Sequence, residues 1–170
     1  CMIVAALLLT ACNSEINQQN NEQYNEQAPY LIPSGIVSRS ISFENPTGEP
    51  GRGGMAVNSA LGKGRKGAPA RLIMPGEEVQ LANINGAGTL RHIWMTTFPQ
   101  PEFLRGGVIR IYWDGQKHPS IESPIGDFFG LAHGKSAGFQ SAVHSVGDMA
   151  GMNIWLPMPF VKSARVTFTN

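Results

Sequence analysis

Cysteine is nearly absent from this chain of 170 residues, which contains Cys1 and Cys12 and no other. The rest of the sequence therefore offers no disulfide framework of the kind that small secreted domains often use. Basic residues are absent before Arg39, and all 13 of them lie beyond residue 38. Residues 31–170 hold 13 basic and 9 acidic residues, and this net charge of +4 is too small and too scattered to indicate a nucleic-acid partner.

Long apolar runs are also scarce, and residues 2–11, MIVAALLLTA, are too few to span a bilayer. A polar segment follows them, which is the order expected of a secretory signal peptide. The run ends at Leu9-Thr10-Ala11-Cys12, which resembles a bacterial lipobox. We therefore expect residues 1–11 to be an N-terminally incomplete lipoprotein signal peptide, although the start of a buried strand or helix is the alternative.

Lipidation of Cys12 would anchor the protein durably, because each buried CH₂ of an acyl chain contributes about 0.8 kcal/mol. The location expected from this anchor is the cell envelope, at the outer membrane or facing the periplasm. Residues 13–30 are rich in Asn, Gln and Glu and have too little apolar content to form a core. We therefore interpret residues 12–35 as a lipidated cysteine with a disordered, flexible polar tether.

Glycine and proline are abundant instead, with 20 and 12 copies, and they favour many turns between short strands. The sequence predicts an all-β fold over residues 36–170, a jelly-roll β-sandwich that stops short of its C-terminal end. Helix is expected in no more than a turn near residues 126–131, because no segment sustains an apolar period of 3.6 residues. The expected strands lie at residues 39–43, 77–84, 88–98, 108–113 and 165–168.

Several common catalytic motifs are missing from the chain. The glycine-rich loop at residues 48–67 lacks the spacing of a phosphate-binding loop, and no G-x-S-x-G elbow is present. The four histidines are not spaced as metal ligands, so we expect neither a metal nor another cofactor. The glycine-rich loop is either a flexible surface loop or one that closes over a ligand through Arg52.

The residues best suited to a polar ligand are two acids and two tryptophans. Glu122 and Asp127 could serve glycosidic chemistry, could accept hydrogen bonds from sugar hydroxyls, or could bind backbone N–H groups or an arginine. Trp94 and Trp113 suit stacking on a sugar ring, although both could belong to the core. Asp114, followed by glycine, has the composition of a hairpin turn, and for this acid we favour a structural role.

Five segments, in order, resemble a bacterial family formerly of unknown function and now placed in glycoside hydrolase family 172. They read ISFENPTGEPGRGG, GKGRKG, INGAGTLRHIWMT, LRGGVIRIYWDGQKHPSIESPIGDFFG and NIWLPMPFVKSARVTFTN, and the resemblance extends over roughly residues 38–170. The resemblance implies a double jelly roll, of which this chain would be the N-terminal half, assembled as a homotrimer or hexamer. It also implies a retaining mechanism on furanosides, either fructofuranosides or D-arabinofuranosides.

No residue of this chain matches the catalytic glutamates that the resemblance implies, so we assign no catalytic residue. The expected function is that of an N-terminal fragment of a lipid-anchored glycoside hydrolase, with an oligosaccharide or polysaccharide as substrate. A non-catalytic glycan-binding or assembly lipoprotein on the same scaffold is the alternative. The candidate substrate contacts are Arg52, Trp94, Trp113, Glu122 and Asp127.

Overall fold

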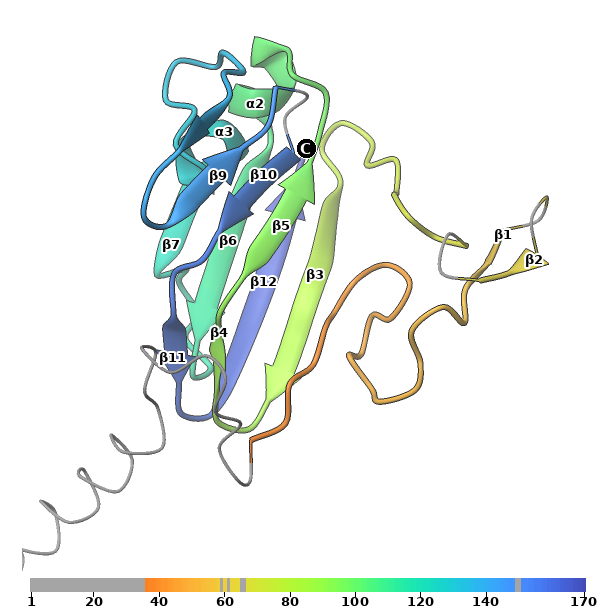
Figure 1. The fold of residues 1–170 in the computed structure, drawn as a ribbon. Coiled ribbons are helices and arrows are strands. Elements are labelled where there is room, and N and C mark those ends of the chain that lie inside the picture. The colour runs from red at the N-terminus through yellow and green to blue at the C-terminus, as the bar shows by residue number, and fades with distance from the viewer. Residues whose placement is uncertain (1–35, 59, 61, 65–66, 149–150) are drawn as a thin grey trace, which may run out of the picture. The chain divides into compact units, whose positions relative to one another are not determined.

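The computed structural model describes residues 36–58, 60, 62–64, 67–148 and 151–170. The predicted signal peptide, the lipidation site at Cys12 and the predicted tether lie outside the described residues. The chain divides into two units, residues 1–38 and 39–170, and all elements named below belong to the second unit. Their architecture is mostly β, with antiparallel sheets and two short helices among the described residues (Figure 1).

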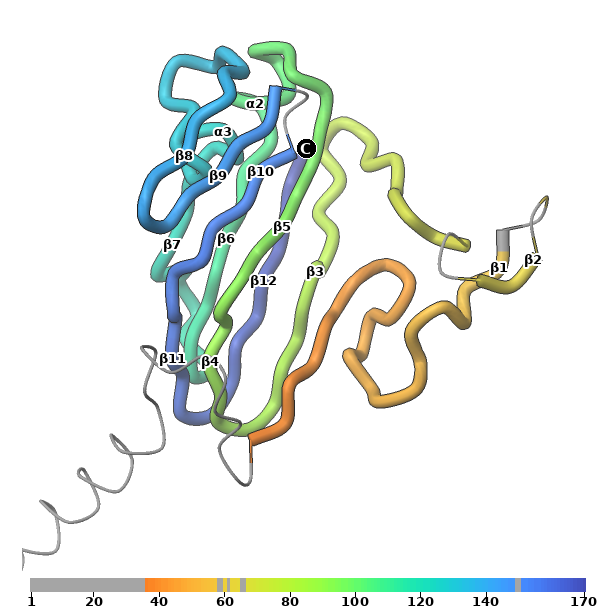
Figure 2. The backbone as a smooth tube through the Cα atoms, in the orientation of Figure 1, coloured from red at the N-terminus to blue at the C-terminus, as the bar shows by residue number. Residues whose placement is uncertain are grey.

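The first large sheet has the order β3-β12-β6-β7, with each strand antiparallel to its neighbours (Figures 1 and 2). Strand β12 lies between β3 and β6 and is the most thoroughly buried strand of this sheet. Its pairing with β3 shifts by a bulge between Val166 and Thr167. The bounds are β3 Glu78–Asn85, β6 Val108–Trp113, β7 Ile121–Pro124 and β12 Ser163–Thr169.

The second large sheet has the order β5-β10-β9-β8, again with antiparallel pairs. Two smaller ladders accompany the large sheets: β4 pairs with β11, and β1 pairs with β2. The bounds in the second sheet are β5 Ile93–Thr96, β8 Phe139–Gln140, β9 His144–Val146 and β10 Gly151–Ile154. The bounds in the smaller ladders are β1 Val57–Asn58, β2 Gly62–Lys63, β4 Gly88–Leu90 and β11 Met158–Phe160.

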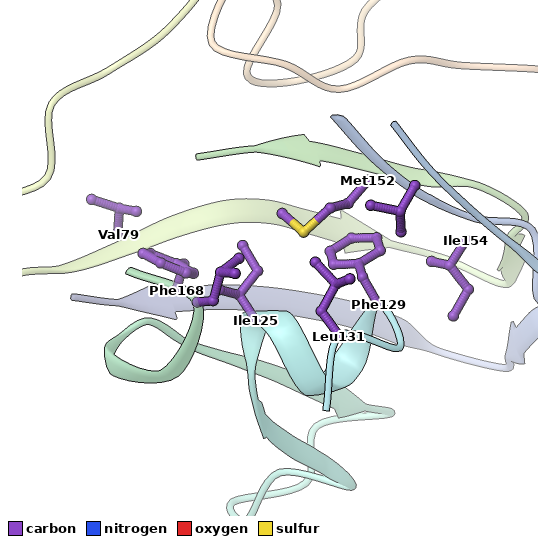
Figure 3. Close-up of a cluster of buried hydrophobic side chains, with 9 residues drawn as sticks. Val79, Ile125, Phe129, Leu131, Met152, Ile154 and Phe168 are labelled. Atoms are coloured by element: carbon purple, nitrogen blue, oxygen red, sulfur yellow. The ribbon is translucent and has the colours of Figure 1, made fainter. Parts of the chain in front are cut away.

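One apolar interior joins the two large sheets and the two helices. Figure 3 shows side chains from β3, β12 and β10 converging with those of the α3 region on this interior. Burial of each large aliphatic or aromatic side chain contributes about 1.5–3 kcal/mol, so this cluster is a main source of stability. The helices are α2 Pro101–Gly106 and α3 Ile125–Phe128. The buried cluster consists of Val79, Leu104, Ile125, Phe129, Leu131, Val146, Met152, Ile154 and Phe168.

The predicted strand at residues 88–98 is divided in the structure. Its first part, β4, pairs with β11, and its second part, β5, pairs with β10. The partner segment is interrupted as well, by Trp155–Pro157 between β10 and β11. Pro157 lies in this interruption and has no backbone N–H with which to continue the ladder.

The strand predicted at residues 39–43 is wrong. The structure has a tight turn there, in which Ser42 and Asn45 exchange backbone hydrogen bonds of 3.0 and 3.2 Å. Gly48 follows with φ +65°, and a Cβ on it would lie 2.8 Å from the side chain of Ile41. The alternation of apolar and polar residues over so short a segment was therefore weaker evidence for a strand than Pro46 and Gly48 were for a turn.

Helix α2 was not expected from the sequence. It begins with Pro101, which tolerates the first helical turn because its missing N–H would have no intrahelical acceptor there. Glu102 lies in the first turn and Arg105 in the last, and both charges complement the helix dipole. Leu104 is fully buried, so tertiary packing accounts for a helix too short to be stable alone.

Asp114 joins the end of β6 to the segment between β11 and β12. It has φ +54°, Gly115 has φ +80°, and the Gln116 N–H donates to the Trp113 carbonyl at 2.9 Å, which are the features of a type I′ turn. One carboxylate oxygen of Asp114 accepts the backbone N–H groups of residues 161, 162 and 163 at 2.9, 2.6 and 3.1 Å. The structural role that we favoured for this acid is what the structure shows.

These backbone hydrogen bonds, above all from Lys162 and Ser163, hold the pKa of the Asp114 carboxyl below its usual value. The folded state therefore binds this proton less readily than the unfolded chain does. The stability that results is fully present above the unfolded pKa, and it is lost as the pH falls through the lower folded pKa.

We predict that Asp114→Asn lowers the melting temperature at neutral pH and weakens its dependence on acid pH. Asp114→Gly removes the acceptor but causes no strain at positive φ, whereas Asp114→Ala removes the acceptor and adds strain. The Asn variant should therefore be the most stable of the three and the Ala variant the least stable. Calorimetry from neutral to acid pH measures both effects. Asp148→Asn, at an exposed acid in the turn before β10, is the control. Equal pH profiles for Asp114→Asn and the unchanged protein would contradict the assignment.

Candidate functional site

Glu122 lies on the outward face of β7 and is bound by an arginine. Arg110 on the neighbouring strand β6 is its register partner and donates from Nε to the Glu122 carboxylate at 2.7 Å. Nη1 of Arg110 donates to the Thr169 hydroxyl at 2.7 Å and lies 3.8 Å from Glu78. The hydrogen bond with Glu122 is the largest of the causes that raise the pKa of Arg110 above its ordinary value.

Asp127 lies in α3 and is bound by a different arginine. Nη1 of Arg105, from α2, donates to both carboxylate oxygens of Asp127, so this ion pair links the two helices. The structure therefore gives Glu122 and Asp127 separate partners on separate elements and does not bring them together. Of the three roles considered for these acids, the binding of an arginine is the one that these contacts show.

Trp113 and Trp94 have opposite environments. Trp113 is half-buried, packs against the inner side of the first sheet, and stacks on Phe160 with ring centroids 6.1 Å apart. Trp94 is 56% exposed, and its neighbours Ile93 and Met95 pack against the core. Since side chains alternate along a strand, Trp94 points outward from β5.

Arg52 lies in the glycine-rich loop, beside an open pocket of about 400 Å³. Its guanidinium is close to Glu49, with an Nε–Oε2 distance of 3.4 Å, and both side chains are largely exposed. An exposed ion pair of this kind holds Arg52 only weakly. The pocket is lined by Phe43, Glu44, Asn45, Pro46, Thr47, Glu49, Arg52, Met55 and Ala56, and none of the other four predicted contacts is among them.

The second sheet carries a group of four side chains, of which Trp94 alone was among the predicted substrate contacts. Trp94 and Asn153 are directly opposite each other in the β5–β10 ladder. Just beyond that ladder, His92 and Trp155 stack with ring centroids 5.0 Å apart and planes 4° from parallel. We call the outward surface formed by His92, Trp94, Asn153 and Trp155 the tryptophan face.

Hydrogen bonds fix the polar members of the tryptophan face. The amide nitrogen of Asn153 donates to the Ser145 backbone carbonyl at 3.3 Å, which leaves the amide oxygen directed at His92. That oxygen lies 3.0 Å from His92 Nε2 and can only accept, so Nε2 carries the proton. In the neutral imidazole, this hydrogen bond leaves Nδ1 of His92 as an acceptor.

The described residues contain no group of three or more His, Cys, Asp or Glu side chains arranged to hold a metal ion. Among the helices that the structure describes, none is long and apolar enough to cross a membrane. His144 is used structurally, since its Nε2 lies 3.3 Å from the Phe128 carbonyl. What the tryptophan face offers a ligand is aromatic rings together with amide and imidazole hydrogen-bonding groups.

Comparison with known families gives one decisive match. The family model described as GH172 domain-like matches residues 67–170, more than half of the chain. The chain belongs to the GH172 domain-like family. This membership confirms the resemblance identified from the sequence and relates the protein to a family of glycoside hydrolases. No curated protein matches the chain.

The matched GH172 region contains β3 to β12 and therefore both large sheets. Trp94, Trp113, Glu122 and Asp127 lie within it, whereas Arg52 lies in the segment before it. The tryptophan face is also entirely inside the region. Trp155 could have been noticed from the sequence, because Asn153 and Trp155 alternate with the apolar Ile154 in NIWLP. Its proximity to His92 could not, because that contact depends on the pairing of β5 with β10.

We predict that the Arg105–Asp127 pair of this GH172 domain contributes about 0.2–1 kcal/mol of coupling energy, because both side chains are partly exposed. A double-mutant cycle with Arg105→Met and Asp127→Asn, followed by urea unfolding, measures this energy. An additive cycle would contradict the pair. Weaker sugar binding by Asp127→Asn at an unchanged melting temperature would instead support the predicted ligand contact.

Proposed function

We propose that this protein is a secreted, lipid-anchored glycoside hydrolase that acts on furanosides, either fructofuranosides or D-arabinofuranosides. The observation that carries the proposal is the GH172 domain-like match over residues 67–170. Two four-stranded antiparallel sheets that share buried apolar clusters are what a jelly roll provides, and we propose that this unit is the first of two. In the proposed anchor, Cys12 carries the lipid and holds the enzyme in the cell envelope, at the outer membrane or facing the periplasm.

The proposed mechanism is retaining, with one carboxyl group as nucleophile and another as general acid, about 5–5.5 Å apart. The acids considered for this site are already bound: Glu122 by Arg110, Asp127 by Arg105, and Asp114 by three backbone N–H groups. An arginine-bound carboxylate is a poor general acid, since the positive charge favours its ionised form. We therefore place the catalytic pair outside the matched region, in a second jelly roll of the proposed protein.

In this proposal the described domain contributes sugar contacts and subunit contacts. Trp94 offers an outward indole on which a sugar ring can stack, and Arg52 offers a guanidinium beside an open pocket. Trp113 would support the fold of the domain through its stack on Phe160 and would not contact the ligand. Glu122 would reach sugar hydroxyls through the carboxylate oxygen that Arg110 does not bind, and Asp127 through the remaining lone pairs of its two Arg105-bound oxygens. We propose a homotrimer or hexamer as the assembly.

A second candidate is a non-catalytic glycan-binding or assembly lipoprotein. The observation that favours it is the separation of the two acids into different arginine pairs, together with the two outward tryptophans. Fold alone does not decide between the candidates, because related folds serve both binding and catalysis. The two are distinguished by turnover.

We predict that the protein encoded by the whole gene releases aryl alcohol from an aryl fructofuranoside or arabinofuranoside and leaves an aryl glucopyranoside intact. Proton NMR of the first-formed sugar should show retention of the anomeric configuration. An inverted first product would overturn the retaining mechanism. Sugar binding without turnover of either furanoside would support the second candidate instead.

A further inference from the structure

The tryptophan face keeps two large indoles in water, Trp94 on β5 and Trp155 directly after the neighbouring strand β10. Trp94 is 56% exposed and Trp155 is 47% exposed, although each follows a side chain that is directed into the core. Exposed tryptophan on a sheet surface loses the free energy that burial would supply, about 1.5–3 kcal/mol for a large apolar side chain. The folded chain therefore forgoes that stabilisation at two adjacent rings, and a ligand that covered them would recover part of it.

The same face is ordered before any ligand arrives. A chain of hydrogen bonds runs from the Ser145 carbonyl through the Asn153 amide to His92 Nε2, and the His92 ring lies parallel to Trp155. Trp155 is held further by its backbone N–H, which donates to the Val143 carbonyl at 2.8 Å. Side chains that are already fixed lose less conformational entropy when a ligand binds.

We propose that the tryptophan face is a glycan-binding surface that holds a neutral oligosaccharide through Trp94 and Trp155. The C–H face of one sugar ring lies on Trp94, and a neighbouring ring of the same chain contacts the indole of Trp155. His92 Nδ1 accepts a hydrogen bond from a sugar hydroxyl, because Nε2 is engaged with Asn153. This inference rests on the proposed function, since it names a binding surface for the substrate class of that enzyme.

The composition of the face favours a sugar over a protein partner. Its four side chains carry no permanent charge, and two of them, His92 and Asn153, bring hydrogen-bonding groups between the indoles. A protein-binding patch is expected to be a contiguous apolar surface with a polar rim. Here the polar groups lie inside the patch, as in sites where a few fixed polar groups orient a ligand among aromatic rings.

The test is an NMR titration of the whole chain, labelled with nitrogen-15, using three oligosaccharides as probes: an inulin-type fructofuranose, an arabinofuranose and, as the pyranose comparison, cellohexaose. The chain has three tryptophans and therefore three indole N–H signals. We expect the signals of Trp94 and Trp155 to shift, while that of Trp113, stacked on Phe160, does not. Shifts with either furanose support the surface and identify the enzyme's substrate class, whereas shifts with cellohexaose alone overturn the assignment of this surface to that class.

Variants assign the effect to individual side chains. Trp94→Ala and Trp155→Ala should each weaken binding by about tenfold, and Asn153→Ala should weaken it less by freeing His92. Phe98→Ala is the matched control, because Phe98 is an exposed aromatic, 64% accessible, that contacts Phe103 and lies outside the face. Trp94→Phe and Trp155→Phe retain a ring and provide the test should either alanine variant fail to fold.

The outcomes separate this inference from the proposed function. Furanoside hydrolysis with no shift of Trp94 or Trp155 by any probe overturns the glycan-binding surface and leaves the enzyme. Binding at both tryptophans without hydrolysis supports the surface and removes the enzyme. Dissociation of an oligomer by Trp94→Ala and Trp155→Ala, with sugar binding unchanged in sedimentation and NMR, shows that a second copy covers the face and overturns the proposal.

Discussion

Burial of the inner side chains of β5 and β10 determines what the second sheet presents to its surroundings. Met152 and Ile154 are at most 4% exposed, and Ile93 and Met95 pack against the same interior. Because alternate residues of a strand point to opposite sides, fixing these four inward fixes Trp94 and Asn153 outward. A shift of one residue in this register would bury the tryptophan and expose the core. The candidate binding surface is therefore a direct consequence of core packing.

Side chains also alternate between inward and outward directions in the first sheet, but its outward side chains are of a different kind. Ala164, Val166 and Phe168 of β12 face the interior, and the outward side carries charged and polar groups that bind one another. Arg110 links Glu122 to Thr169, and the Arg165 guanidinium lies 3.7 Å from the centre of the Tyr112 ring. A surface whose charges are paired internally gives a ligand little to bind without displacing existing contacts. The two large sheets therefore have similar architectures, but they differ in how many of their outward side chains remain available to bind a ligand.

Sequence patterns predicted the strands whose signals are local. Alternation and apolar content gave β6 over residues 108–113, as observed, and placed β3 and β12 within two residues at each end. The short strands β8 to β11 were not predicted, because two to four residues among glycines and prolines carry little periodicity. Helix α2 was missed for a similar reason: Leu104 is buried by the tertiary fold, which local propensity cannot reveal.

The candidate site was predictable only in part, because the sequence shows which residue types are present but not which side chains they contact. Glu122 and Asp127 were recognised as acids near one another in sequence, yet each is neutralised by an arginine that the sequence could not assign. Trp94 was recognised as suited to stacking, but its polar neighbours were not. Asn153 lies opposite Trp94 and orients His92, which is 61 positions away from Asn153 in the sequence. Strand pairing supplies such partners, and it is set by the whole core.

The rigidity of the tryptophan face bears on how binding and catalysis could be divided between parts of the protein. A binding surface gains from rigidity, because each rotamer-rich side chain that must be immobilised costs about 0.5–1.5 kcal/mol on association. Strand geometry, the His92–Trp155 stack and the Asn153 hydrogen bonds supply that rigidity here without any free carboxylate. A catalytic pair, by contrast, needs two carboxyl groups whose environments drive their pKa values apart. Arginine-bound acids on separate elements do not provide that difference, whereas the glycan-binding role that we propose for the tryptophan face needs no free carboxylate.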